Sequence, residues 1–180
     1  SEEIANVLRN EGLEVKVVNA KKEKIRDISE YDLVIVGSGM MMDRWTGEPE
    51  KFLKKFQGEL SKKKLALFVS SGGQALIERE GKYEEFHFGG KSTTLYGAEA
   101  TGRARKKYLE EKAAKYSLKP VALGLFGGIW DFNHTPWYAG MAMKAIKSKL
   151  EATGLKEIKP GVYNTRDWDA IRGWAKSLAA

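Results

Sequence analysis

An apolar run in the first third of the chain leads directly into residues that could line a ligand site. Residues 33–36 show no polar alternation, and the run ends at Gly37, which is typical of a strand buried on both faces. Such strands belong to parallel sheets, where ligands bind in the crevice at the carboxyl ends of the strands. The segment from Ser38 to Trp45 is therefore a candidate ligand-binding loop.

The same pattern recurs after a second apolar run. Residues 65–69 are followed by the small residues Ser70, Ser71, Gly72 and Gly73. Glycine allows a ligand to come close to the backbone, but glycine and serine also dominate ordinary turns. The segment 70–74 is a second candidate loop, with a plain turn as the alternative.

The residue types exclude several kinds of catalysis, and no catalytic set can be identified. The chain has no cysteine, which excludes disulfides, thiolate metal sites and thiol catalysis. Any redox chemistry must therefore come from a bound organic cofactor. His87 and His134 could exchange protons, but neither belongs to a paired carboxylate pattern or a metal-ligand spacing. Surface or packing positions are the simpler interpretation of both, and no metal site is predicted.

Length and charge limit the class of protein further. The 180 residues predict a single domain over 1–180. The net charge of +7 comes from basic clusters at 21–22, 62–64 and 103–107, which lie at predicted turns or helix surfaces. No aromatic stacking motif accompanies them, so solvated faces are favoured over nucleic-acid binding. Attraction to an acidic partner or an anionic membrane surface stays open.

The location expected from the sequence is the cytoplasm. No apolar run approaches the roughly 20 residues that span a bilayer, and no signal-peptide pattern is present before the first helix.

Short apolar runs alternate with amphipathic segments along the chain, which predicts a doubly wound α/β sheet. A hairpin-like insertion at 74–100 is expected to leave the sheet. The final helix should bury Trp168, Ile171, Trp174 and Ala175 at helical spacing. The expected helices are 2–12, 47–60, 103–116, 137–152 and 167–179, and the expected strands are 13–19, 33–36, 65–69 and 121–126.

Several motifs give the chain a resemblance to a known family over essentially its whole length. They are the helix from Ser1, the strand and loop 32–40, and the ending 164–175. The most specific parts are Gly127-Gly128, Met141-Ala142-Met143-Lys144 and Arg166-Asp167-Trp168-Asp169. The chain resembles the flavodoxin-like family, and within it a subgroup that includes menaquinone-dependent protoporphyrinogen dehydrogenases and flavodoxin-domain proteins.

The resemblance implies a flavodoxin-like sheet of order 2-1-3-4-5 with helices on both faces, and one FMN held by three loops at the carboxyl ends of the strands. The phosphate loop would lie between the first strand and the first helix, where a helix N-terminus favours a dianion. Only Ser1 could be its final hydroxyl, and Ser1 as a helix cap is the alternative. We expect about ten preceding residues, one strand and a turn; otherwise FMN would bind weakly.

The two candidate loops would then contact the flavin ring. Met40, Met41 and Met42 can make soft contacts with an aromatic ring, and Trp45 can stack on it. The alternative is that the methionines fill gaps in the core beneath the next helix. The loop of Ser70, Ser71, Gly72 and Gly73 would offer N–H groups to the pyrimidine end of the ring.

The function expected from this resemblance is FMN-dependent electron transfer to or from a quinone, a porphyrinogen or a redox partner protein, in an oxidoreductase. The basic charge favours peripheral contact with an anionic membrane. The alternative is a flavodoxin-shaped module without cofactor that serves as an interaction or subunit domain, with residues 130–137 as an interface. Nucleic-acid binding is not expected.

Overall fold

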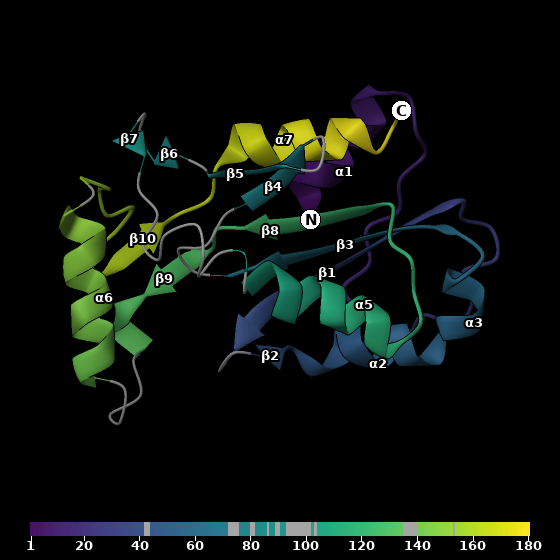
Figure 1. The fold of residues 1–180 in the computed structure, drawn as a ribbon, viewed down its shortest axis with the longest axis horizontal. Helices are drawn as coiled ribbons and strands as arrows, with labels where there is room; N and C mark the ends of the chain where they lie inside the picture. Colours follow the sequence, from purple (N-terminus) through teal and green to yellow (C-terminus); the bar gives the residue numbers. More distant parts are fainter. Residues whose placement is uncertain are drawn as a thin grey trace.

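Three parallel strands form the centre of the fold (Figure 1). In the computed structural model, β1 (Leu33–Met41) pairs with β3 (Lys64–Ser70), which pairs with β8 (Ala122–Phe126). The structure describes residues 1–41, 44–71, 76–79, 82–85, 87–88, 91–92, 102, 104–134, 140–152 and 154–180. Residues 65–69 of β3 are all buried, as expected of a strand covered on both faces.

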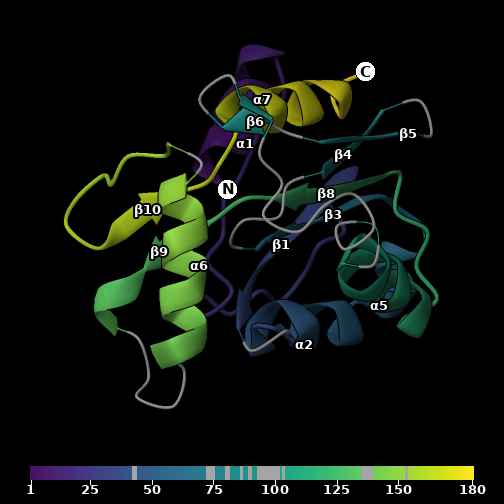
Figure 2. The ribbon, with the colours of Figure 1, turned by 60° about the vertical axis from the view of Figure 1, so that its left-hand side comes forward.

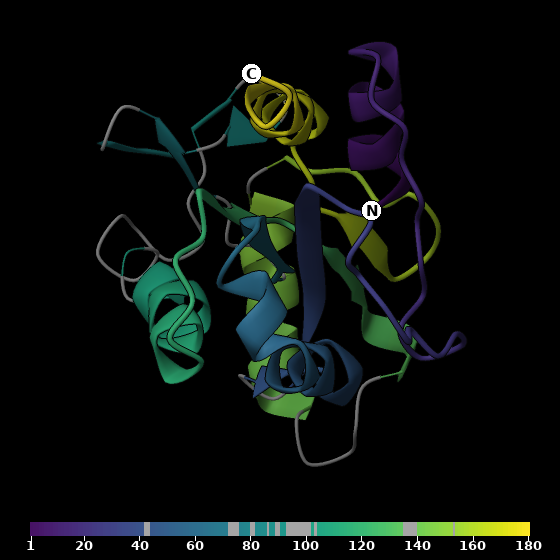
Figure 3. The same ribbon diagram turned by 90° about the vertical axis from the view of Figure 1, so that its right-hand side faces the viewer.

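The side chains of β3 alternate between two apolar clusters, one on each face of the sheet. Leu65, Leu67 and Val69 join one cluster, and Ala66 and Phe68 join the other. The first cluster is covered by α2 (Gly47–Lys55), α3 (Gln57–Leu60) and the helix made of a π-helical turn, η1 (Lys106–Glu110), and α5 (Glu111–Lys115). The second is covered by α1 (Glu2–Asn10) and α7 (Trp168–Ser177). Figure 3 shows the two helix layers on opposite sides of the strands. The expected flavodoxin-like α/β fold is confirmed.

The segment 13–19 is not a strand, so the edge strand expected there is wrong. The segment lies beside β1 without ladder hydrogen bonds, and a cavity of about 460 Å³ lined by Lys16, Val18, Val34 and Val36 separates them. Extended chain becomes a strand only when a neighbour pairs with its backbone. Among the described residues, β1 is paired on this side only by β2 (Arg44–Trp45), at Met40 and Met41. A further strand between them stays a prediction.

The insertion 74–100 is expected to leave the sheet. This expectation is wrong in part, because the first two described strands of the insertion extend the sheet. β4 (Leu76–Arg79) pairs antiparallel with the outer edge of β8 and carries β5 (Lys82–Glu85) as the last strand. An unpaired edge is a template for a further strand, and β4 covers it. In the described part of the insertion, β6 (His87–Phe88) and β7 (Lys91–Ser92) pair with each other apart from this sheet.

A small lobe lies beyond the carboxyl end of β8. It consists of β9 (Ile129–Asp131), the 3₁₀ turn η2 (Phe132–His134), α6 (Gly140–Ala152) and β10 (Val162–Asn164), which pairs antiparallel with β9. Figure 2 shows α6 beside the two strands. The expected helix 137–152 is confirmed over α6, and residues 135–139 lie outside the described part.

The two terminal helices agree with the sequence in position but not in every buried residue. Gly12, at φ +87°, follows the end of α1, and the Asp167 carboxylate accepts a hydrogen bond from the Ala170 N–H at the start of α7. Trp174 is 3% exposed, but Trp168 is 38% exposed. The expected burial of Trp168 is therefore wrong, because the first turn of α7 extends past the apolar cluster to the end of the sheet.

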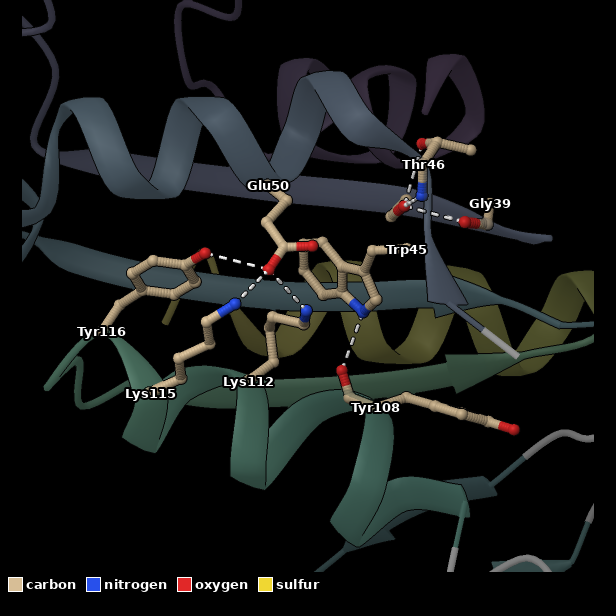
Figure 4. A network of polar contacts seen from close by, with 9 residues as sticks. Gly39, Trp45, Thr46, Glu50, Tyr108, Lys112, Lys115 and Tyr116 are labelled. Atoms are coloured by element: carbon tan, nitrogen blue, oxygen red, sulfur yellow. Dashed lines mark hydrogen bonds and ion pairs between the residues drawn. The ribbon is translucent and has the colours of Figure 1, made fainter. Parts of the chain in front are cut away.

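An ion-pair network joins α5 to α2 (Figure 4). The Glu50 carboxylate lies 2.7 Å from Lys115 Nζ and 2.9 Å from Lys112 Nζ. It also accepts a 2.9 Å hydrogen bond from the Tyr116 hydroxyl. Hydrogen bonds from Lys115 and Lys112 lower the pKa of Glu50 to about 2. The network therefore stabilises the folded state when Glu50 is ionised.

We expect Glu50→Gln to lower the free energy of unfolding at pH 7 by about 1–2 kcal/mol, after allowance for solvent screening. The pKa of Glu50 is depressed from an ordinary 4.5 to about 2. Its contribution is therefore complete above pH 4.5 and is lost as the pH falls through about 2. Urea unfolding of both proteins across this range measures the difference. Glu48→Gln, which breaks only an exposed pair with Lys51, is the matched control; an equal loss in both variants would contradict the prediction.

Candidate functional site

A cleft lies at the carboxyl ends of the three parallel strands. One cavity of about 490 Å³ is bounded by Gly37, Gly39, Ser70 and Gly127 from the strand ends, and by Ser1 at the start of α1. A second cavity, of about 990 Å³, adjoins it and shares Ser1, Glu2 and Gly37. These volumes are in the range of small-molecule and cofactor sites. The structure thus brings three of the predicted regions, represented by Ser1, Ser38 and Ser70, to one place.

The smaller cavity has an aromatic wall. The rings of Phe68 and Phe126 lie 5.8 Å apart and both pack edge-on against Trp174, so the wall is fixed by the core. A side chain cannot be added at Gly37, since its Cβ would lie 2.0 Å from Phe68 Cζ. A Cβ at Gly39, in contrast, would meet nothing within 4 Å. The backbone of β1 is therefore open to a ligand at Gly39.

The segment from Ser38 to Trp45 is not the loop that the sequence predicts. β1 continues to Met41, and β2 turns back beside it, with Met40 opposite Trp45. The buried Ser38 hydroxyl donates to the Gly39 carbonyl at 2.8 Å and accepts from the Thr46 N–H at 3.0 Å. It therefore fixes the turn into α2, and it contributes to the cleft as part of the wall.

Trp45 joins β2 to η1 and also lines the larger cavity. The indole is 6% exposed, and its Nε1–H donates a 2.8 Å hydrogen bond to the Tyr108 carbonyl. Met40 is half-buried and packs against the same core cluster, as the core-filling alternative expects. The side chain of Met41 and all of Met42 lie outside the described part. Contact of Trp45 or the methionines with a flavin stays a prediction.

The second candidate segment is described only in part. The Ser70 hydroxyl donates a 2.9 Å hydrogen bond to the Gly127 carbonyl, and the Ser71 N–H donates to the Phe126 carbonyl at 2.8 Å. These bonds join the ends of β3 and β8. The Ser70 hydroxyl hydrogen and the Ser71 N–H are therefore already donated within the protein. Gly72 and Gly73 lie outside the described residues, and their N–H groups stay a prediction.

The C-terminal segment supplies two cleft residues that the sequence did not indicate. Arg166 and Trp168 line the smaller cavity beside Ser1. The Arg166 guanidinium carbon lies 5.5 Å from the centre of the Trp168 ring, a cation–π distance. The segment 166–169 was read only as a family marker. The signal available in the sequence was an arginine two residues before a tryptophan, with the helix-capping residue Asp167 between them.

A tight backbone contact holds this segment at the cleft. Thr165, which is fully buried, exchanges hydrogen bonds with Gly128 through both its N–H and its hydroxyl, at 2.9–3.0 Å. A Cβ at Gly127 would lie 2.0 Å from the Thr165 carbonyl oxygen. The two glycines therefore allow the last connection of the chain to cross directly over the end of β8.

His134, another polar candidate, does not line the cleft. The His134 side chain is 83% exposed and bonds to Asp131 at 2.9 Å, which confirms its surface interpretation. The side chain of His87 is not described. Among the described residues, no three histidine or carboxylate side chains gather as metal ligands. In the same part of the chain, no helix has the length and apolar character needed to cross a membrane.

We expect Gly127→Ala to lower the free energy of unfolding by about 1–3 kcal/mol, because the added Cβ forces the Thr165 backbone away from β8. The urea midpoint measures the loss. Gly39→Ala, where the new Cβ meets no atom within 4 Å, is the matched control and should leave the midpoint nearly unchanged. A midpoint unaffected by Gly127→Ala would contradict the close approach.

Comparison with known proteins agrees with this geometry. A family model described as the flavodoxin domain matches residues 1–154, which include the three central strands. No curated protein matches the chain significantly. The matched region ends before the segment of Arg166 and Trp168. Because the match covers most of the chain and the sheet has the corresponding architecture, the chain belongs to the flavodoxin domain family.

Proposed function

We propose that this protein binds FMN in the cleft at the carboxyl ends of β1, β3 and β8, and works as a flavin-dependent redox protein. Flavodoxin domains typically bind FMN. The observation that carries the proposal is the cavity bounded by Gly37, Gly39, Phe68 and Phe126. Its aromatic wall suits a flat ring, and the backbone at Gly39 lies open for close contact.

The residues of the cleft have separate tasks in this proposal. A bound flavin supplies the transfer of a hydride or of single electrons, and the protein supplies position and electrostatics. Phe68 and Phe126 exclude water from one side, and the open backbone at Gly39 admits the ring edge. The larger cavity beside Trp45 and Thr46 has room for the remainder of the cofactor or for the approach of a redox partner.

The finer part of the proposal concerns the electron partner. The resemblance to menaquinone-dependent protoporphyrinogen dehydrogenases suggests an oxidoreductase that exchanges electrons with a quinone, a porphyrinogen or a redox protein. An excess of basic residues supports an anionic membrane as the place of reaction. Arg44, Lys107, Lys112 and Lys115 border a hollow of about 490 Å³ with two carboxylates, Glu50 and Glu111, and the net charge of the chain is +7. Such a surface is attracted to anionic lipid from the cytoplasmic side.

The purified full-length protein should take up FMN and show the two-band absorption of an oxidised flavin, which is bleached by dithionite. Gly39→Val should raise the FMN dissociation constant at least tenfold, because its side chain projects into the open part of the cleft. Flavin fluorescence titration measures this. Gly58→Val, on α3 with no atom within 4 Å of the new Cβ and outside the two cleft cavities, is the control for the added side chain.

A colourless protein that also fails to take up added FMN would reject this function. It would favour the second candidate, an interaction module without cofactor. In that case the hollow beside the basic residues of α5 would be the first surface to examine for a partner.

Membrane contact can be measured separately from FMN binding. The protein should sediment with vesicles that contain anionic phospholipid at low salt, and should be released at high salt as the charges are screened. Vesicles of neutral lipid alone are the control. No sedimentation with the anionic vesicles at low salt would remove membrane contact from the proposal while leaving FMN binding intact.

A further inference from the structure

We propose that Arg166 binds the phosphate of the flavin mononucleotide and that Trp168 holds its guanidinium in place. The inference rests on the proposed FMN function and names a phosphate-binding residue outside the region that matches the flavodoxin domain. Both side chains line the smaller cavity, together with Ser1 and Ser70. A phosphate in this cavity would therefore lie within reach of Arg166, the one arginine among the described residues that line it.

The position of Arg166 is fixed from both sides along the chain. Thr165 before it is clamped to Gly128, and Asp167 after it caps α7. The Arg166 N–H itself donates to the Asn164 side chain at 3.2 Å. The Trp168 ring then supports the guanidinium from one face. A group held in this way loses little freedom on binding, which favours affinity.

The positive charge of Arg166 is not neutralised by a carboxylate in the described part of the chain. Among the described residues Arg166 has no ion pair, whereas the nearby Arg172 pairs with both Glu3 and Asp169. A planar guanidinium can donate two parallel hydrogen bonds to phosphate oxygens. The cation–π contact with Trp168 does not use the N–H donors of the guanidinium.

The start of α1 contributes to the same end of the cavity, together with two carboxylates, Glu2 and Glu3, of which Glu3 is paired with Arg172. The first hydrogen bond of the helix joins the Ala5 N–H to the Ser1 carbonyl, so the N–H groups of Glu2, Glu3 and Ile4 have no acceptor within the helix. They favour an anion. The Glu2 carboxylate also borders the cavity and repels a bound anion. Arg166 offsets this charge, which makes it the decisive cation for a phosphate dianion.

The consequence is discrimination between FMN and riboflavin, which differ only in the phosphate. Arg166→Gln should raise the dissociation constant for FMN about tenfold, since a charge-assisted bond is lost. The same substitution should change the dissociation constant for riboflavin by less than about twofold, because the ring contacts remain. Arg166→Lys, which keeps the charge but not the paired donors, should fall between. Fluorescence titration of each variant with both flavins gives the ratio, which is insensitive to a partial loss of folded protein.

Lys176→Gln is the matched control, because it removes a cation on α7 that does not line the cavity and whose partner, Glu11, does not line it either; it should leave the FMN to riboflavin ratio unchanged. A wild-type protein that binds both flavins, with an unchanged ratio in Arg166→Gln, would overturn this inference and leave the proposed function standing. A wild-type protein that binds neither flavin would overturn both. An equal loss for the two flavins would assign Arg166 to ring contacts or to the fold, and would also overturn the inference.

Discussion

The cleft depends on the contact between Gly127-Gly128 and Thr165. The backbone of Thr165 lies so close to Gly127 that no Cβ fits between them, and its hydroxyl and N–H both bond to Gly128. This contact turns the chain from β10 across the end of β8 and into α7. It thereby sets the Asn164–Trp168 connection over the ends of the strands, beside the first turn of α1.

The aromatic core extends this constraint into the sheet. Trp174 of α7 packs edge-on against Phe68 and Phe126, whose other edges face the cavity. The two phenylalanine rings therefore form a wall of the cleft and also hold the C-terminal helix through Trp174. Trp45 has the corresponding task on the opposite face, where its bond to Tyr108 joins β2 to η1. Part of the cleft wall is therefore made of residues that also belong to the core.

The sequence was sufficient for the central strands and most helices, because buried parallel strands such as β3 have unbroken apolar runs that few other structures have. It was insufficient at the edges of the sheet. The segment 13–19 alternates like a strand, but pairing needs a neighbour that the apolar pattern does not reveal. β4 joined the sheet because β8 offered a free edge. The length of β1 was also missed, since Gly37, Ser38 and Gly39 read as a loop although they pair with Phe68, Val69 and Ser70 of β3.

Within the site, sequence reasoning found the residues at the strand ends and missed those that cross over them. Ser38 and Ser70 were predicted from their place after apolar runs, but the structure uses their hydroxyls to join neighbouring segments. Arg166 lies far from these runs in the chain and reaches the cleft only through the tertiary contact at Thr165. Arg166 lines the cavity and contacts Trp168, whereas Arg172 pairs with Glu3 and Asp169. This difference depends on how α7 and the segment before it pack against α1 and the strand ends. No periodicity along the chain encodes that choice, and only the packed structure separates the paired arginine from the one whose charge faces the cavity.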